Sequence, residues 1–207
     1  MKGKFITFEG SEGSGKSTQS KLLSGYLRRK GFKVIFLREP GGTKISEKIR
    51  QILLDNKNDG MSRECEMLLY MAARAQVTRE VILPALGSGE IVICDRFLDS
   101  TIAYQGYGLG IDIKAIKHIG NLATSGIKPN LTIFLDLPIK KGLKHRKFKE
   151  DRIEKRAMSY HLRVRRGYLK LANAEQGRIK IVKVDRDKRK TQSAIRGLVE
   201  KYVIQRY

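Results

Sequence analysis

The chain alternates between short apolar runs and longer stretches whose apolar residues recur with helical spacing. Five runs have the length and composition of buried strands: residues 4–9, 33–37, 90–94, 131–136 and 178–184. Strands that are separated by helices predict a parallel sheet, and right-handed crossovers make such a sheet doubly wound. We therefore expect an α/β fold with a doubly wound, five-stranded parallel sheet and helices on both faces.

The stretches between the strands predict the helices. After residue 16, Leu23, Tyr26 and Leu27 lie on one face of a helix. Ser62 is suited to cap a long helix that ends near residue 86. Further helices are expected at 44–54, at 99–105, at 112–124, from 138 onward, at about 154–174 and at 190–204.

Residues 10 to 18 match the phosphate-binding pattern G-x-x-x-x-G-K-[ST], between a predicted strand and a predicted helix. The glycines let the backbone turn its N–H groups toward phosphate oxygens, and the helix N-terminus adds partial positive charge. Lys16 suits the β- and γ-phosphates, and the Ser17 hydroxyl suits Mg²⁺. A chance match is the alternative, which both flanks disfavour. The predicted ATP-binding residues here are Gly10, Ser11, Glu12, Gly13, Ser14, Gly15, Lys16, Ser17 and Thr18.

A second polar site follows the apolar run that ends at Cys94. Asp95 is placed to hold Mg²⁺, directly or through water. Arg96 can clamp a transferring phosphoryl group or an acceptor phosphate. The alternative is a helix-capping Asp95 with Arg96 as its surface ion partner. Because ligands lie at the carboxyl ends of such strands, we favour the phosphate site, with Glu12 as a weaker candidate for the metal.

Three further groups are candidates for binding the rest of a nucleotide, although each alone is an ordinary surface feature. Residues 38–43 form a turn-rich loop, Arg-Glu-Pro-Gly-Gly-Thr. Tyr70 and Arg74 are one helical turn apart, so a ring and a guanidinium can address one base. The third group is a polar helix face made by Ser100, Thr101, Tyr104 and Gln105. A Gln amide both donates and accepts, which suits a pyrimidine edge.

Composition narrows the class of protein. A chain of 207 residues predicts one domain, or one domain with a small insertion. The two cysteines, Cys65 and Cys94, show no disulfide or zinc pattern, which fits a reducing cytoplasm. No signal peptide and no membrane span are expected. The net charge of +22 predicts either nucleic-acid binding or an anionic small substrate, and the lack of aromatic residues among the basic stretches favours the second.

Together, these motifs resemble those of bacterial thymidylate kinases. The matching stretches follow the family's order: 8–18, 38–43, 72–74, 95–106, 151–154 and 160–169. The resemblance covers nearly the whole chain, and the joint presence of Arg-Glu-Pro-Gly-Gly-Thr and Ala-Tyr-Gln-Gly is highly specific. It implies a single nucleoside monophosphate kinase domain over residues 1–207, of the P-loop NTPase type. It also implies conversion of dTMP to dTDP with ATP and Mg²⁺ by a homodimer.

The resemblance implies roles for individual residues. It places Tyr70, where the family commonly has Phe, on the thymine ring and Arg74 at a thymine carbonyl. It places Tyr104 against the deoxyribose. Asp185 and Arg186 lie where the family holds adenine. The remaining implied contacts, to the base and the monophosphate, come from Glu39, Arg50, Arg96, Ser100, Thr101 and Gln105.

The resemblance also implies a short basic lid at about residues 144–154. Some family members carry a basic residue within the phosphate loop, and others carry it in the lid. Residues 11–14 include no basic residue, so the chain looks like the lid type. Which of Arg146 and Arg152 reaches the γ-phosphate stays open. The predicted catalytic residues are Lys16, Arg96, Arg146 and Arg152.

Three alternatives remain at this stage. The chain could phosphorylate another monophosphate such as uridylate, could be a nucleic-acid-dependent P-loop ATPase, or could bind nucleotides without catalysis. Only the charge of +22 suggests the second, and the intact Lys16, Ser17 and Asp95 disfavour the third. The expected partners are ATP, dTMP and a second copy of the chain, with no nucleic acid required and no membrane.

Overall fold

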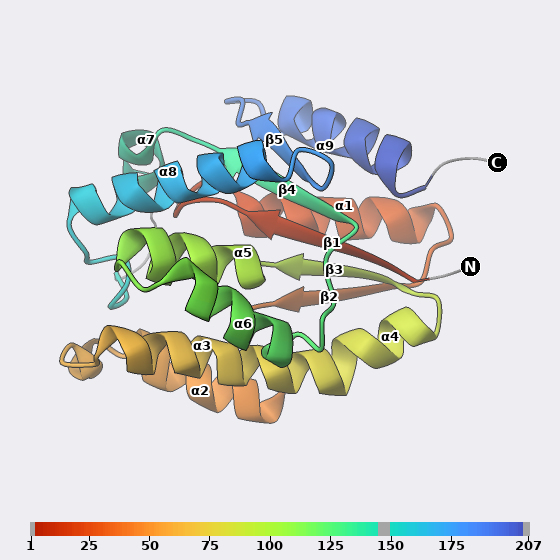
Figure 1. Ribbon diagram of the computed structural model, residues 1–207. Helices are drawn as coiled ribbons and strands as arrows, with labels where there is room; N and C mark the ends of the chain where they lie inside the picture. The colour runs from red at the N-terminus through yellow and green to blue at the C-terminus, as the bar shows by residue number, and fades with distance from the viewer. Residues whose placement is uncertain (1–2, 145–149, 205–207) are drawn as a thin grey trace.

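One five-stranded parallel sheet forms the centre of the protein, in a computed structural model that describes residues 3–144 and 150–204 (Figure 1). The strands lie in the order β2-β3-β1-β4-β5, and all four neighbouring pairs are parallel. Their bounds are Lys4–Glu9 for β1, Val34–Arg38 for β2, Ile91–Asp95 for β3, Leu131–Asp136 for β4 and Ile179–Lys183 for β5. This sheet confirms the predicted fold class.

Helices cover both faces of the sheet. On one face, Ile6 and Phe8 of β1 pack in a cluster with Leu23 of α1 (Lys16–Arg29) and Ile195 of α9 (Lys188–Tyr202). On the other face, Phe5 packs in a cluster with Val77 at the end of α3 and with Ala85 of α4, because successive side chains of a strand point to opposite faces. The helices of this second layer are α2 (Lys44–Leu54), α3 (Arg63–Val77), α4 (Leu83–Gly87), α5 (Leu98–Thr101), α6 (Ile113–Ala123) and α8 (Met158–Ala174).

Three predicted helices differ from those in the structure. The helix expected over 62–86 is divided into α3 and α4 by a π-helical turn, Thr78–Ile82. Pro84 gives a physical reason, because it has no N–H to continue the α-helical hydrogen bonds. The helix expected at 99–105 is α5 followed by a π-helical segment, Ile102–Gly108. The helix expected from 154 begins at Met158.

A network of polar side chains joins the sheet to α5. Arg178, just before β5, donates two hydrogen bonds to the Asp99 carboxylate, at 2.6 and 3.0 Å. It also donates to Thr132 of β4, whose hydroxyl lies 2.8 Å from that of Thr7 in β1. The network fixes α5 on the sheet, and α5 carries the next residue, Ser100, toward the ends of the strands.

The phosphate loop packs backbone to backbone against α7 (Ile139–Lys144). A Cβ atom added to Gly142 would lie 2.3 Å from the carbonyl oxygen of Glu12, and one added to Gly13 would lie 2.0 Å from the carbonyl oxygen of Gly142. Gly13 also has a φ angle of +69°, which favours glycine. The close approach therefore needs glycine on both sides.

In the part of the chain that the structure describes, no helix is both long enough and apolar enough to cross a membrane.

Candidate active site

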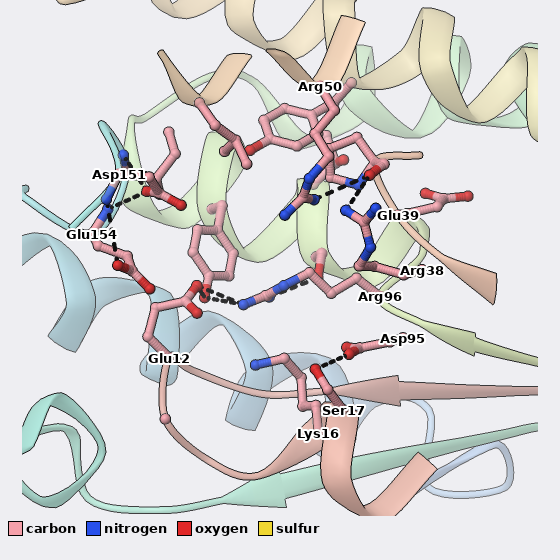
Figure 2. Close-up of a pocket in the computed structure, with 18 of the residues that line it drawn as sticks. Glu12, Lys16, Ser17, Arg38, Glu39, Arg50, Asp95, Arg96, Asp151 and Glu154 are labelled. Carbon is pink, nitrogen blue, oxygen red and sulfur yellow. Dashed lines mark hydrogen bonds and ion pairs between the residues drawn. The ribbon is translucent and has the colours of Figure 1, made fainter. Parts of the chain in front are cut away.

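A cavity of about 670 Å³ lies at the carboxyl ends of β1, β2 and β3. Its walls come from the phosphate loop, from residues 38–40, and from Arg50, Leu54, Tyr70, Asp95, Arg96, Ser100, Thr101, Tyr104, Gln105, Asp151, Ile153 and Glu154. Figure 2 shows Arg96 reaching across this cavity toward Glu12, with Lys16 on one side and Arg38 and Arg50 on the other. Among the described residues, four cationic side chains thus line the cavity, which suits a polyanionic ligand.

The phosphate loop holds Lys16 at the floor of the cavity. Gly15 has a φ angle of +85° and precedes α1, so the loop turns directly into the helix N-terminus. The ammonium of Lys16 is nearly buried and donates to the Ser11 carbonyl oxygen at 2.9 Å. Burial and the nearby Arg96 lower the pKa of Lys16. The loop therefore presents backbone N–H groups and one cation to the same space.

Ser17 and Asp95 form a pair of oxygen donors that fits Mg²⁺. The Ser17 hydroxyl donates to Oδ2 of Asp95 at 2.5 Å, as Figure 2 shows. Oδ1 of Asp95 is buried and has no hydrogen-bond partner among the described residues. Those residues contain no cluster of three or more His, Cys, Asp or Glu side chains that could hold a metal alone. Mg²⁺ needs few protein ligands when phosphates and water supply the others, so this pair is suited to Mg²⁺ on a nucleotide.

Arg96 links the phosphate loop to the other side of the cavity. It has a φ angle of +74°, and its guanidinium donates to Oε1 of Glu12 at 2.6 Å and to the Tyr104 hydroxyl at 3.0 Å. It also donates to the Gly10 carbonyl oxygen and to Ser100, each at 3.2 Å. Burial by itself raises the pKa of Glu12, but the neighbouring Arg96 guanidinium outweighs burial and helps lower this pKa to about 2. Glu12 is therefore an anion, which a bound phosphate can replace as the partner of Arg96.

Glu9 is a site residue that the sequence did not single out. It ends β1, is fully buried, and accepts hydrogen bonds from Phe97 N at 2.8 Å, from Ser100 at 2.6 Å and from Tyr168 at 2.9 Å. Burial raises the pKa of Glu9 to about 7. The three donors fix the loop that carries Arg96. The only sequence signal was an acidic residue at the end of an apolar run, next to the first glycine of the phosphate loop.

Arg74 lies behind the cavity, where it joins the loops after β2 and β3. Its guanidinium is 1% exposed and donates to Glu39 at 2.8 Å, and to Thr101 Oγ1 and the Phe97 carbonyl oxygen at 3.0 Å each. Glu39 and Thr101 line the cavity, but Arg74 is not among the lining residues. The predicted contact of Arg74 with a base stays a prediction, and in this structure its donors serve Glu39 and Thr101.

The upper wall of the cavity in Figure 2 brings together Arg38 and Arg50. Arg50 donates to the Pro40 carbonyl oxygen at 3.1 Å, and burial together with Arg38 lowers its pKa. Arg38 pairs with Glu47 at 2.9 Å; it belongs to the candidate loop 38–43, although no individual role was predicted for it. Tyr70, Ser100, Tyr104 and Gln105 also line the cavity.

Two predicted groups lie outside this arrangement. Arg152 is nearly buried, pairs with Glu66 at 2.6 Å and donates to the Leu53 carbonyl oxygen at 3.0 Å. Arg146 falls among residues 145–149, outside the described residues. Asp185 and Arg186 are exposed after β5 and are not among the residues that line the cavity. The roles of these residues stay predictions.

Comparison with known proteins gives one consistent result. Residues 8–195 match the family model described as "Thymidylate kinase". The chain is 53% identical over 189 residues to the thymidylate kinase of Geotalea daltonii, covering 87% of this chain and 88% of the relative. It is 45% identical over 204 residues to that of Thermoanaerobacter sp. strain X514, covering 98% and 100%. The crystal structure of thymidylate kinase from Ehrlichia chaffeensis superposes with a TM-score of 0.81 at 33% identity, covering 96% of this chain and 100% of that one.

The pairing of Arg96 with Glu12 leads to a prediction about charge. We expect Arg96→Met to raise the pKa of Glu12 above about 2, because burial would then be opposed by Lys16 and the Tyr104 hydrogen bond without the guanidinium. Titration of the Glu12 carboxyl carbon by NMR measures this pKa. The matched control is Arg63→Met, which removes a surface arginine paired with Glu64. A Glu12 pKa that stays near 2 in Arg96→Met contradicts the assignment.

Proposed function

The chain belongs to the thymidylate kinase family, and from this membership and its site we propose that it transfers the γ-phosphoryl group of ATP to dTMP. The products are dTDP and ADP. A nucleic-acid-dependent ATPase is not favoured, because such a protein has no need of a second anion site beside the phosphate loop. The reaction belongs to the biosynthesis of dTTP, and a cytoplasmic location is part of the proposal.

The observation that carries the proposal is the position of Arg96. Its guanidinium touches the Gly10 carbonyl of the phosphate loop and also Ser100 and Tyr104 on the opposite wall. A cation in this place can contact both the transferring phosphoryl group and an acceptor phosphate. Two polyanions brought into line repel each other, and fixed positive charge offsets that repulsion.

The step itself needs no general base. An oxygen of the dTMP phosphate forms a bond to the γ-phosphorus, while the bond from that phosphorus to the β–γ bridging oxygen breaks and ADP leaves. A phosphate monoester has a second pKa of about 6, so the acceptor is already largely ionised at neutral pH. Lys16 and Arg96 stabilise the charge that develops on the transferred group. Ser17 and Asp95 would hold Mg²⁺, with Glu12 as the weaker candidate, acting through the metal's waters; the ion would supply further positive charge on the phosphates.

The substrate contacts implied by the resemblance are part of this proposal. Tyr70 stacks on thymine, Tyr104 lies against the deoxyribose, and Glu39, Arg50 and Arg96 surround the monophosphate. Support comes from the cavity, which is lined by all five of these side chains. Adenine is expected near Asp185 and Arg186. The residues of the phosphate loop are proposed to bind ATP. Arg74, Ser100, Thr101 and Gln105 are proposed to complete the contacts with dTMP.

A homodimer is also proposed. The second helical layer exposes large apolar side chains: Ile45 and Ile52 of α2 are 51% and 47% exposed, and Leu68 of α3 is 51% exposed. Leu122 of α6 is 81% exposed. Contiguous exposed apolar surface is typical of a protein interface, and these helices are the ones expected to pair in the family.

The first prediction from the proposed function concerns the phosphorylation of dTMP itself. With ATP and Mg²⁺, dTMP should be phosphorylated far better than dCMP, AMP or GMP in an assay coupled to ADP release. Lys16→Ala should lower kcat by about two to three orders of magnitude, because it removes a cation from the transferring group. Lys21→Ala, on the exposed side of the same helix, is the matched control. ADP release that requires nucleic acid and ignores dTMP would show that the proposal is wrong.

The second prediction separates the two lid arginines. Arg146→Ala should lower kcat by about tenfold or more with little change in the KM for dTMP, because the contact forms mainly on closure. Arg152→Ala should instead lower the unfolding midpoint, since it removes a partner of buried Glu66. Lys147→Ala is the control within the lid. Loss of kcat in Arg152→Ala alone would give that arginine the catalytic role, and wild-type kcat in both would rule out a lid arginine.

The third prediction concerns assembly. Sedimentation velocity should show a dimer for the wild type and a monomer for Leu68→Glu, because a charge would be buried in the apolar interface. Leu162→Glu, at a site on α8 that is 46% exposed, should leave the dimer intact. A monomeric wild type at micromolar concentration contradicts the proposal.

A further inference from the structure

The chemistry of the Gln105 side chain does not by itself determine which way its amide is oriented. A Gln amide can present either its oxygen, an acceptor, or its nitrogen, a donor, to a ligand. Thymine carries N3–H, a donor, between two carbonyl oxygens, whereas cytosine has an unprotonated N3, an acceptor, next to an amino group. Which end of the Gln105 amide faces the base therefore decides which pyrimidine it accepts.

In the structure, Glu66 determines the orientation of the Gln105 amide. Nε2 of Gln105 donates to Oε1 of Glu66 at 2.9 Å, and the two residues are 1% and 0% exposed. An ionised carboxylate only accepts hydrogen bonds, so the amide nitrogen must face Glu66. Oε1 of Gln105 accepts from none of the described residues, and Gln105 lines the cavity. The oxygen is therefore the part of the amide left for a ligand.

Two arginines hold Glu66 in this role. Arg156 donates to both carboxylate oxygens, at 3.2 and 2.7 Å, and Arg152 pairs with Oε2 at 2.6 Å. A carboxylate with two guanidinium partners keeps its orientation. It cannot rotate to release Gln105 without breaking these pairs. Because the cluster is buried, a flipped amide would also place its oxygen against a carboxylate oxygen.

Thr101 completes a complementary pattern one helical turn earlier. Its Oγ1 accepts from Arg74 at 3.0 Å, and its own proton has no acceptor among the described residues. It can therefore donate to a carbonyl such as O4 of thymine. An acceptor from Gln105 beside a donor from Thr101 matches thymine, and the Gln105 oxygen opposes the unprotonated N3 of cytosine.

We propose that Glu66 is a positioning residue for base selection: by fixing the amide of Gln105, it makes the site accept thymine and reject cytosine. The proposal rests on the function proposed above. Glu66 itself does not touch the substrate. Its effect passes through one buried hydrogen bond, and cytosine is refused because two acceptors would face each other without water.

The test compares kcat/KM for dTMP, dCMP and dUMP. Glu66→Gln lets the neighbouring amide turn, since the new side chain can donate to the oxygen of Gln105. We expect the dTMP-to-dCMP ratio to fall about tenfold or more. The dTMP-to-dUMP ratio should change less than about twofold, because uracil has the same N3–H and O4. Glu64→Gln, an exposed glutamate of the same helix turn, should change neither ratio.

A double-mutant cycle separates positioning from a merely structural role. In a Gln105→Met background, Glu66→Gln should change the dTMP-to-dCMP ratio no further, because the amide on which it acts is gone. If Glu66→Gln does not fold, Glu66→Asp keeps the charge for both arginines but withdraws the oxygen from Gln105, and it should lower the same ratio.

The outcomes distinguish this proposal from the function on which it rests. If the wild type does not phosphorylate dTMP, the proposed function fails. If it does, and the dTMP-to-dCMP ratio keeps its wild-type value in the folded Glu66 variant, the positioning role is overturned. A ratio that falls equally with and without Gln105 also overturns it, because Glu66 would then act by another route.

Discussion

The site depends on two cations held in one small space, Lys16, which is buried, and Arg96, which is partly buried. An unpartnered buried charge costs several kcal/mol, so each needs an anion or a carbonyl oxygen nearby. Glu12 and backbone carbonyls of the phosphate loop supply these partners. These partners follow β1, whereas Arg96 follows β3, and the two strands are neighbours in the sheet. The order of the strands thus fixes the electrostatics, and the positive charge is in place before a ligand arrives.

The sheet and the phosphate loop could be predicted because their signals are local. A short apolar run, a glycine loop and an amphipathic helix each lie within a few residues of one another. Ser17 and Asp95 were each assigned to Mg²⁺ from local signals, the phosphate-loop pattern and the end of an apolar run, and in the structure the two side chains are hydrogen-bonded. Glu66 could not be recognised in this way. In sequence it is a helix-start residue, and its partners Gln105, Arg152 and Arg156 become visible only when the chain is folded.

The segment before α8 shows how tertiary pairing overrides helical pattern. The spacing predicted a helix from about residue 154, but the Asp151 carboxylate accepts from the N–H groups of Ile153 and Glu154, which forms a turn. Arg156 then extends to Glu66 instead of continuing a helix face. The sequence shows the type of each site residue but not the partner of its side chain. For this reason, the roles assigned to single site residues remain predictions.

Gly13 and Gly142 have a consequence for exchanging parts between relatives. Where Gly13 and Gly142 meet, backbone packs directly against backbone. The phosphate loop and the base of the lid therefore fit each other as one unit, because no side chain lies between them that could change its conformation. A chimera that borrows a lid from another protein has to splice after residue 142, or import the partner loop as well. The boundary of the exchangeable segment is therefore set by Gly13 and Gly142, which have no side chains, and it lies beyond the end of β4.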